Sequence, residues 1–271
     1  MMAVESTNWI SVGELAESFA ADPNLLARNG DLAGRRLDLS FEDGEVVTYD
    51  FVSPEHLRVG DDETQESYLA TSIRPGIYFV DFVRSGRDAG TSVSLVIDLD
   101  RGVATAVIGR MPDAAAAHGD ILARAQRREE LTLVPTAFRA ATIGKPHDPA
   151  LPHHAPTGEL IGLRIQHRYS PHELYEHIYL NEKRYAWHCV EGAEVGLADT
   201  DRCHYYAIDK ELFLFVWREK IVPTLGVCLI DLAALKTTGK IFGYADDTLT
   251  KLVNFPTGAR STALNRTRYV R

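Results

Sequence analysis

An internal repeat of short apolar segments restricts the fold of this chain more than any other feature. The segment IYFVDFV at residues 77–83 corresponds to LFLFVWR at residues 212–218, at an offset of 135 residues. Phe41 corresponds to Tyr169 at an offset of 128 residues. Because the offset changes only between apolar segments, insertions would fall in loops and leave the segments intact. The repeat therefore predicts two related halves that fold alike.

Both halves have the pattern of β-strands separated by turns. Segments such as VVTYDFV, SVSLVIDL, EHIYLN and GVCLIDL alternate between apolar and polar residues or stay apolar over a few positions, as strands do. Asp-Gly, Pro-Gly and Arg-Gly pairs mark reversals of the chain. Closure of each half into a small barrel would leave no exposed strand edge. We predict an all-β fold of two tandem antiparallel barrels, in residues 1–145 and 157–271, with one large sandwich as the alternative.

Three segments depart from the strand pattern. Residues 9–28 predict a helix, with Ser11 as its N-cap and Glu14 three residues later as in a capping box. We expect this helix to pack across a sheet or to close one end of a barrel. Residues 113–130, where four alanines precede ILARAQRREE, predict a helix between two strands. Residues 144–159 hold four prolines and three histidines, a composition typical of a linker.

The charge and the apolar pattern exclude several classes of function. The net charge is -9 at pH 7, and the acidic residues are spread along the chain, so no basic face is available for nucleic acid. No apolar stretch is long enough to cross a bilayer, and the N-terminus lacks the pattern of a signal peptide. We therefore expect a soluble, cytoplasmic protein that does not bind a membrane. The sequence leaves a homo-oligomer possible.

The cysteines give no sign of a structural metal. Cys189, Cys203 and Cys228 are odd in number and widely spaced, unlike the ligands of a zinc site or the partners in a disulfide framework.

The segment TTGK at residues 237–240 lacks the glycines and the following helix of a phosphate loop, and it is expected to form a turn. No metal or cofactor is expected.

The second half differs chemically from the first. Eight of the ten histidines lie between His147 and His204. Alternate residues of a barrel strand face inward, and the repeat places His, Tyr and Trp in the second half at positions that are mostly aliphatic in the first. A buried ring with an unpaired polar atom costs roughly 1–3 kcal/mol. The second barrel is therefore expected to enclose a ligand cavity.

The candidate site residues share one strand phase. The catalytic candidates are Glu219, Tyr169 and His167, and Glu219 is the sharpest because a carboxylate that follows FLFVW on a strand is costly to bury unless it is paired. Taken singly, each candidate could be a hydrogen-bonded core side chain or part of the wall. The ligand-binding candidates are rings on the same phase: His177, Tyr179, Trp187, His204, Tyr206 and Trp217.

Long motifs resemble one known family. YSPHELYEHIYLNEKRYAWHCVEGAEVGLADTDRCHYY, LFLFVWREKIVPTLG and TTGKIFGY are similar to the C-terminal domain of the MoaF family (molybdenum cofactor biosynthesis protein F), and IRPGIYFVDFV is similar to its N-terminal domain. The resemblance covers nearly the whole chain, and it implies two lipocalin/calycin-like barrels. The family name says little about activity, and no residue here suggests the handling of pterin or molybdenum.

A fainter likeness is to phenolic acid decarboxylases, which are lipocalin-like barrels that remove CO2 from hydroxycinnamates without a cofactor. Their Tyr-x-Tyr motif corresponds to His167-Arg168-Tyr169, and their acid after a V-Y-x-V-x-W stretch corresponds to Glu219 in LFLFVWRE. One tyrosine is thus replaced by His167. The carboxylate-binding arginine of that family has no secure counterpart, although Arg202 lies nearby in sequence.

Three functions remain open at this point. The first is a cofactor-independent lyase or isomerase for a small aromatic or phenolic metabolite, in which Glu219 transfers a proton and Tyr169 and His167 orient the substrate. The second is a non-catalytic calycin that binds such a molecule. The third is a metal enzyme with three imidazoles and a carboxylate as ligands: His167, His177, His204 and Glu219.

Overall fold

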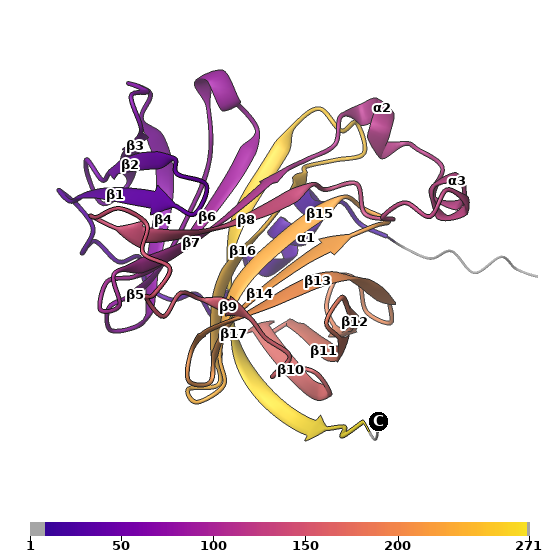
Figure 1. Ribbon diagram of the computed structural model, residues 1–271. Coiled ribbons are helices and arrows are strands. Elements are labelled where there is room, and N and C mark those ends of the chain that lie inside the picture. Colours follow the sequence, from indigo (N-terminus) through magenta and orange to yellow (C-terminus); the bar gives the residue numbers. More distant parts are fainter. Residues whose placement is uncertain (1–8, 270–271) are drawn as a thin grey trace, which may run out of the picture.

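The computed structural model describes residues 9–269 and consists of two closed antiparallel barrels in tandem (Figure 1). The predicted all-β fold is confirmed. Each strand of the first barrel pairs with the next strand in the chain, and the last strand returns to the first. The strands of this barrel are β1 (Arg36–Phe41), β2 (Val46–Asp50), β3 (His56–Val59), β4 (Glu66–Arg74), β5 (Ile77–Val83), β6 (Thr91–Asp98), β7 (Val103–Arg110) and β8 (Thr136–Ile143).

The second barrel repeats this architecture. It closes through pairing of its third and fourth strands, and the short strand β9 (Ala155–Pro156) in the linker adds to one edge. A short 3-10 helix, η1 (Gly86–Asp88), lies in the first barrel. The strands of the second barrel are β10 (Leu163–Ser170), β11 (Glu173–Asn181), β12 (Arg184–Glu191), β13 (Ala198–Asp209), β14 (Leu212–Glu219), β15 (Thr224–Asp231), β16 (Lys236–Tyr244) and β17 (Leu252–Arg266).

The two interiors differ as the repeat predicts. The first barrel is filled by an apolar cluster that includes Leu39, Phe51, Val80 and Leu95. The corresponding cluster of the second barrel is rich in rings that carry a polar atom, namely Tyr169, Tyr175, Tyr179, Tyr185, Trp187, Tyr205 and Trp217. The first barrel is therefore a packed core, whereas the second contains buried polar groups that need partners.

The barrels dock through their outer faces. Phe79 of β5 and Val107 of β7 belong to one apolar cluster with Val216 of β14, Val227 of β15 and Phe242 of β16. Strands of both barrels are therefore apolar on their outward phase as well as their inward one. Because both faces of these strands are buried, apolar and polar residues no longer alternate along them, and the sequence does not indicate which face lines the barrel interior.

The N-terminal helix α1 (Val12–Phe19) is shorter than predicted. Its start agrees with the sequence, because Ser11 and Glu14 form the expected capping box. It ends before Asp22, which adopts a positive φ of 53°, and Pro23, which cannot continue a helix.

Helix α1 packs on the second barrel although it precedes the first one in the chain. Figure 1 shows it, in indigo, beside the strands of the second barrel. Gly243 of β16 allows this close approach, because a Cβ atom there would lie 2.5 Å from the Val12 side chain. The helix thus covers one end of the second barrel, as a helix that closes a barrel end would.

The segment predicted as one helix at 113–130 forms two short ones, α2 (Ala114–Ala117) and α3 (Ile121–Gln126). Asp113 and Asp120 each cap the start of one helix, and Gly119 lies between the two. Glycine followed by a new capping residue interrupts a helix that alanine propensity alone would extend. Within residues 9–269, no helix is long and apolar enough to cross a membrane.

The loop that carries these helices ends at a row of arginines on the second barrel. Arg184, Arg202 and Arg218 are direct cross-strand neighbours on β12, β13 and β14. Glu130 contacts two of them, with its carboxylate 3.3 Å from Arg184 Nη2 and 3.2 Å from Arg202 Nε. Since like charges placed directly opposite one another destabilise a sheet, Glu130 offsets repulsion as well as fixing the loop.

We expect Glu130→Gln to lower the free energy of unfolding by about 1 kcal/mol. The loss should shrink in high salt, which screens repulsion between partly exposed arginines. Urea unfolding at low and high salt measures both effects, and Glu159→Gln on the exposed linker is the matched control. An equal effect of the two substitutions would contradict the role assigned to Glu130.

Candidate functional site

A small cavity lies inside the second barrel, beneath helix α1. Its volume is about 30 Å3, which is room for about one water molecule. Aromatic rings form most of its wall, and two glutamates face it. The lining residues are Leu15, Phe19, Tyr169, Tyr175, His177, Tyr185, Trp187, Glu194, Trp217, Glu219 and Ile241.

Strand β14 positions the most reactive of these groups. Phe213, Phe215 and Trp217 occupy its inward phase, and Glu219 follows them on the same phase at the end of the strand. Opposite Trp217 stands Gly226 of β15, where a Cβ atom would lie 2.0 Å from the indole ring. The glycine therefore leaves the space that the indole fills.

Glu219 accepts one hydrogen bond within residues 9–269. Trp217 Nε1 donates to Glu219 Oε1 at 2.9 Å. Burial raises the pKa of Glu219 well above its ordinary value, and the charges of Asp201 and Glu194 raise it further, whereas the indole bond lowers it. A carboxyl with a raised pKa in an aromatic cavity is suited to proton transfer near neutral pH.

Two further carboxyl groups surround this acid. Trp187 Nε1 donates to Asp201 Oδ2 at 3.0 Å, and the Tyr175 hydroxyl donates to Glu194 Oε2 at 3.0 Å. Burial raises the pKa of Asp201 and also that of Glu194. Neither Asp201 nor Glu194 is among the predicted site residues. The run GLADTDRCHYY favours a turn role for Asp201, which instead lies within β13. Asp201 lies two residues before Cys203 on β13, so both side chains face the barrel interior, and this spacing could have identified Asp201. Glu194 lies in a loop, where alternation of apolar and polar residues gives no prediction.

His167 and His177 are deeply buried next to each other. Their ring centroids are 4.7 Å apart, and His167 Nδ1 lies 2.9 Å from the Ser261 hydroxyl on β17. Burial lowers the pKa of His167 to about 3 and that of His177 well below its ordinary value. Both rings are therefore neutral at physiological pH. His167 Nε2 and His177 Nδ1 have no hydrogen-bond partner within the described residues.

Tyr179 is fully buried, and its hydroxyl also lacks a partner among residues 9–269. Because a buried unpaired hydroxyl costs about 1–3 kcal/mol, we expect Tyr179→Phe to stabilise the protein by about 1 kcal/mol. The matched control is Tyr68→Phe in the first barrel, where the hydroxyl donates to Ser53 O at 2.9 Å and its removal should destabilise. Thermal unfolding of both variants checks this. A Tyr179→Phe loss as large as the Tyr68→Phe loss would mean that the hydroxyl is hydrogen-bonded in solution.

Most of the predicted site residues meet in one place. Glu219, Tyr169, His177, Trp187 and Trp217 line the cavity. His167 and Tyr179 are buried in the same barrel, with His167 against His177 and Tyr179 6.1 Å from His177 between ring centroids. Glu219 and Tyr169 therefore face the same side of the barrel wall, as the repeat predicts.

Two predicted site residues lie elsewhere. His204 and Tyr206 are on the outer face of β13, where both rings pack against Phe138 of the first barrel at centroid distances of 4.7 and 5.1 Å. The inner face of β13 instead carries Cys203 and Tyr205. The expectation that His204 and Tyr206 face the cavity is therefore wrong.

The cause of this error is the phase assigned to β4, which serves as the template for β13. Apolar alternation on this strand predicts that Leu69 and Ile73 face inward, but Tyr68 and Ala70 fill the first barrel, and Ile73 packs between the barrels. Docking of the barrels buries the outer face of β4 and makes both phases apolar. The same correction removes the four-ligand metal set, because His204 is outside the barrel. Among the described residues, no group of three or more His, Cys, Asp or Glu side chains is arranged to hold a metal.

Two other expectations are also revised by the geometry. Arg202, considered as a carboxylate-binding residue, is on the outer face with Glu130 and does not line the cavity. TTGK, expected to be a turn, lies within β16 and pairs with β15 and β17. Leu15 and Phe19, which cover the cavity, are not predicted from the sequence, because contacts between α1 and the second barrel leave no local pattern.

Helix α1 covers part of the cavity. Phe19 lies 4.8 Å from Tyr169 between ring centroids, and Leu15 also lines the space. A cavity that holds benzene has a volume of about 150 Å3, several times the volume found here. A ring-sized ligand therefore requires displacement of Phe19 or of the helix.

Both halves of the chain match models of known domains. Models of the MoaF N-terminal domain and the MoaF C-terminal domain match residues 7–113 and 154–267. The chain is 43% identical to Protein MoaF of Klebsiella aerogenes over 267 residues, or 96% of this chain and 97% of that protein. A solved structure titled "Crystal Structure of a putative beta-lactamase from Burkholderia vietnamiensis" has 14% identity and a TM-score of 0.32 over 39% of this chain and 95% of that chain. With both domain models matched in order and a relative that spans nearly its whole length, the chain belongs to the MoaF family.

Proposed function

We propose that the second barrel is a cofactor-independent lyase or isomerase for a small aromatic or phenolic metabolite, with Glu219 as its proton-transfer group. The observation that carries the proposal is the placement of this acid. Glu219 lines an aromatic cavity, accepts one hydrogen bond from Trp217 Nε1, and has a raised pKa because of burial. A carboxyl kept protonated near neutral pH can act as a general acid and, after donating, as a base.

The lining favours a neutral ring over an aromatic carboxylate. No lysine or arginine is among the described residues that line the cavity, while Glu194 and Glu219 are. An anionic substrate would face these carboxyls without a counter-ion, which is costly in a buried site. We therefore favour a phenol or another uncharged aromatic molecule as the ligand.

Each neighbouring residue has a role in this proposal. Tyr169 and the neutral His177 would hydrogen-bond the polar group of the ligand, and the rings of Trp187 and Trp217 would pack on its faces. His167 contacts His177 rather than the cavity, so it would position that ring. Phe19 on α1 would move aside to admit the ligand and then exclude water around the acid.

The second candidate is a non-catalytic barrel that binds such a molecule. The observation that favours it is the position of helix α1, which covers a cavity of about 30 Å3. A carrier needs such a cover to retain its ligand, and it needs no proton-transfer group. In that case Glu219 would serve only as a hydrogen-bonding group. A cytoplasmic location also remains a prediction of the sequence.

The test combines binding with product analysis. Phenol, benzoate and benzylamine, three rings of similar size and different charge, are titrated into the protein by calorimetry. Substituted phenols are then incubated with it and examined by mass spectrometry. We expect phenol to bind more tightly than benzoate, and a substituted phenol to be converted by the wild type but not by Glu219→Gln.

The outcomes separate the alternatives. Binding of phenols with no product in any incubation would support the carrier. Preferential binding of benzoate would contradict the ligand class, and preferential binding of benzylamine would assign the acids to a cation. Equal turnover by the wild type and Glu219→Gln would overturn the role of the acid.

A further inference from the structure

A larger cleft lies between the two barrels, separate from the cavity under α1. Its volume is about 600 Å3, within the range of small-molecule sites. Strands β4 and β5 form one wall, and β16 and β17 form the other. The cleft exists only because the barrels dock, so neither half has this site alone.

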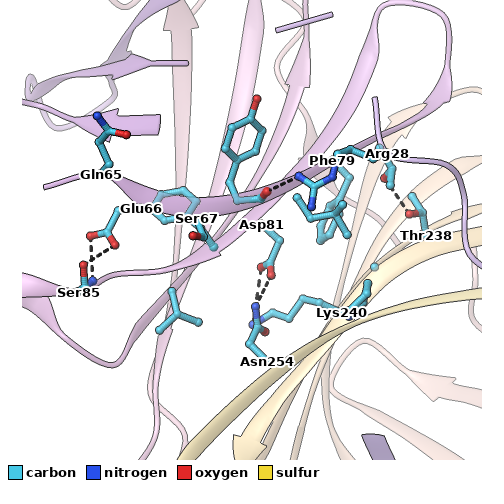
Figure 2. Close-up of a pocket in the computed structure, with 17 residues that line it drawn as sticks. Arg28, Gln65, Glu66, Ser67, Phe79, Asp81, Ser85, Thr238, Lys240 and Asn254 are labelled. Carbon is cyan, nitrogen blue, oxygen red and sulfur yellow. Dashed lines mark hydrogen bonds and ion pairs between the residues drawn. The ribbon is translucent and has the colours of Figure 1, made fainter. Parts of the chain in front are cut away.

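Lys240 of β16 lines this cleft, and Figure 2 shows its side chain extending toward Asp81. Its side chain is only 1% exposed. The Nζ atom donates to the Ser92 hydroxyl and lies 4.8 Å above the ring of Phe242. Burial lowers the pKa of Lys240 to about 8, although nearby Asp81 raises it.

An acid stands beside this amine. Asp81 Oδ1 is 3.9 Å from Lys240 Nζ. The Ser94 hydroxyl donates to Asp81 Oδ1 at 2.7 Å, and Asn254 Nδ2 donates to Asp81 Oδ2 at 2.6 Å. Burial raises the pKa of Asp81. The burial that favours a neutral amine therefore also favours a neutral acid next to it.

We propose that the inter-barrel cleft is a second site, in which Lys240 is a nucleophile that forms an imine with a small aldehyde or ketone and Asp81 is its acid. An amine with a lowered pKa and a carboxyl group within reach, both at the wall of a cleft that admits a small molecule, are what this chemistry requires. Asn254 and Ser94 position the acid. The cleft wall, which includes Leu69, Phe79 and Pro256, suits an apolar carbonyl compound.

The step balances without another reactant. The lone pair of Lys240 Nζ attacks the carbonyl carbon, and the carbonyl oxygen leaves as water. One proton of that water comes from the Asp81 carboxyl and the other from the amine. The products are an iminium ion on Lys240, which keeps one N–H, and the Asp81 carboxylate as its counter-ion.

The structural alternative is that Lys240 and Asp81 only join the barrels, since Asp81 belongs to the first and Lys240 to the second. Reductive trapping separates the two. The wild-type protein is incubated with benzaldehyde and sodium cyanoborohydride at neutral pH, digested, and mapped by peptide mass. Lys145, whose side chain is 53% exposed, is the internal reference.

We expect Lys240 to gain one benzyl group at least about tenfold faster than Lys145, because burial lowers the pKa of Lys240 and so increases its share of neutral amine. Lys240→Arg should abolish this adduct and leave labelling at Lys145 unchanged, and Lys145→Arg should have no effect on Lys240. Labelling of the wild type at surface lysines with none at Lys240, or at Lys240 no faster than at Lys145, would overturn the proposal. The wild-type measurement decides the matter even if a variant fails to fold.

Discussion

Glu219→Gln is expected to remove turnover and, at the same time, to stabilise the protein. Loss of a general acid lowers rates by about 10²–10⁴-fold. The variant should therefore convert a substituted phenol about 10²–10⁴-fold more slowly than the wild type. The fold should survive, because the glutamine carbonyl can still accept the hydrogen bond that Trp217 Nε1 donates to Glu219. Comparison of initial rates for the two proteins checks the first half of this prediction.

The gain in stability follows from the raised pKa of Glu219. A carboxyl with a raised folded-state pKa stabilises the protein below its unfolded pKa, and this contribution is lost as the pH rises through the folded pKa. Glutamine never ionises and avoids that loss. Glu219→Gln should therefore be more stable by about 1–2 kcal/mol above neutral pH, with no gain in acid.

Urea unfolding at a series of pH values measures this difference. The matched control is Glu159→Gln, a solvent-exposed position, where we expect no pH-dependent gain. A stability gain for Glu219→Gln that grows toward acid would have the wrong sign. It would mean that Glu219 is stabilised as the carboxylate.

Arg74→Met is expected to destabilise the docked barrels by about 3 kcal/mol. Arg74 on β4 binds Asp231 on β15 with two hydrogen bonds, from Nε at 2.8 Å and from Nη2 at 2.9 Å. The Asp231 side chain is only 3% exposed, so removal of the guanidinium leaves a buried carboxylate without its counter-ion. Methionine keeps the apolar stem, which isolates the loss of charge. Urea unfolding of the wild type and the variant measures the cost.

The control for this pair is Arg58→Met. Arg58 donates to Asp50 at a similar distance, 3.0 Å, but both side chains are substantially exposed, so its loss should cost well under about 1 kcal/mol. Equal costs for Arg74→Met and Arg58→Met would contradict the clamp between the barrels.

The pH dependence gives a second check on Arg74. Burial alone would raise the pKa of Asp231, but hydrogen bonds from Arg74 and from backbone N–H groups outweigh it and lower the pKa. A lowered folded-state pKa stabilises the protein above the unfolded pKa, and this stability is lost as the pH falls through the folded pKa. The difference between wild type and Arg74→Met should therefore shrink in acid.

The sequence carries enough information to predict the barrels because the fold is repeated. Strands β1–β8 correspond in order to β10–β17, and the offsets change only in loops. On β10, β11, β12 and β14, alternation assigns the inward face correctly and brings Glu219 together with Tyr169 and His177. Local periodicity is sufficient where only one face of a strand is buried. On β14, whose outer face also packs between the barrels, the correspondence with β5 assigns the inward phase.

What the sequence could not predict depends on contacts between distant segments. Docking buries the outer face of β4 and β13, which hides the true phase and misplaces His204 and Tyr206. Packing of α1 on the second barrel brings Phe19 into contact with Tyr169, although the whole first barrel lies between them in the sequence. The cleft with Lys240 and Asp81 likewise forms only when β5 of the first barrel lies beside β16 of the second. No sequence motif therefore predicts it.

The most direct test of the account is the protonation state of Glu219. Carbon-13 NMR of protein labelled at glutamate side-chain carboxyls, with the Glu219 signal assigned by its absence in Glu219→Gln, reports that state as the pH is raised. We predict that Glu219 ionises at a clearly higher pH than the exposed glutamates, because burial raises its pKa. Ionisation of Glu219 together with the exposed glutamates near about pH 4 would contradict the proposed proton-transfer role.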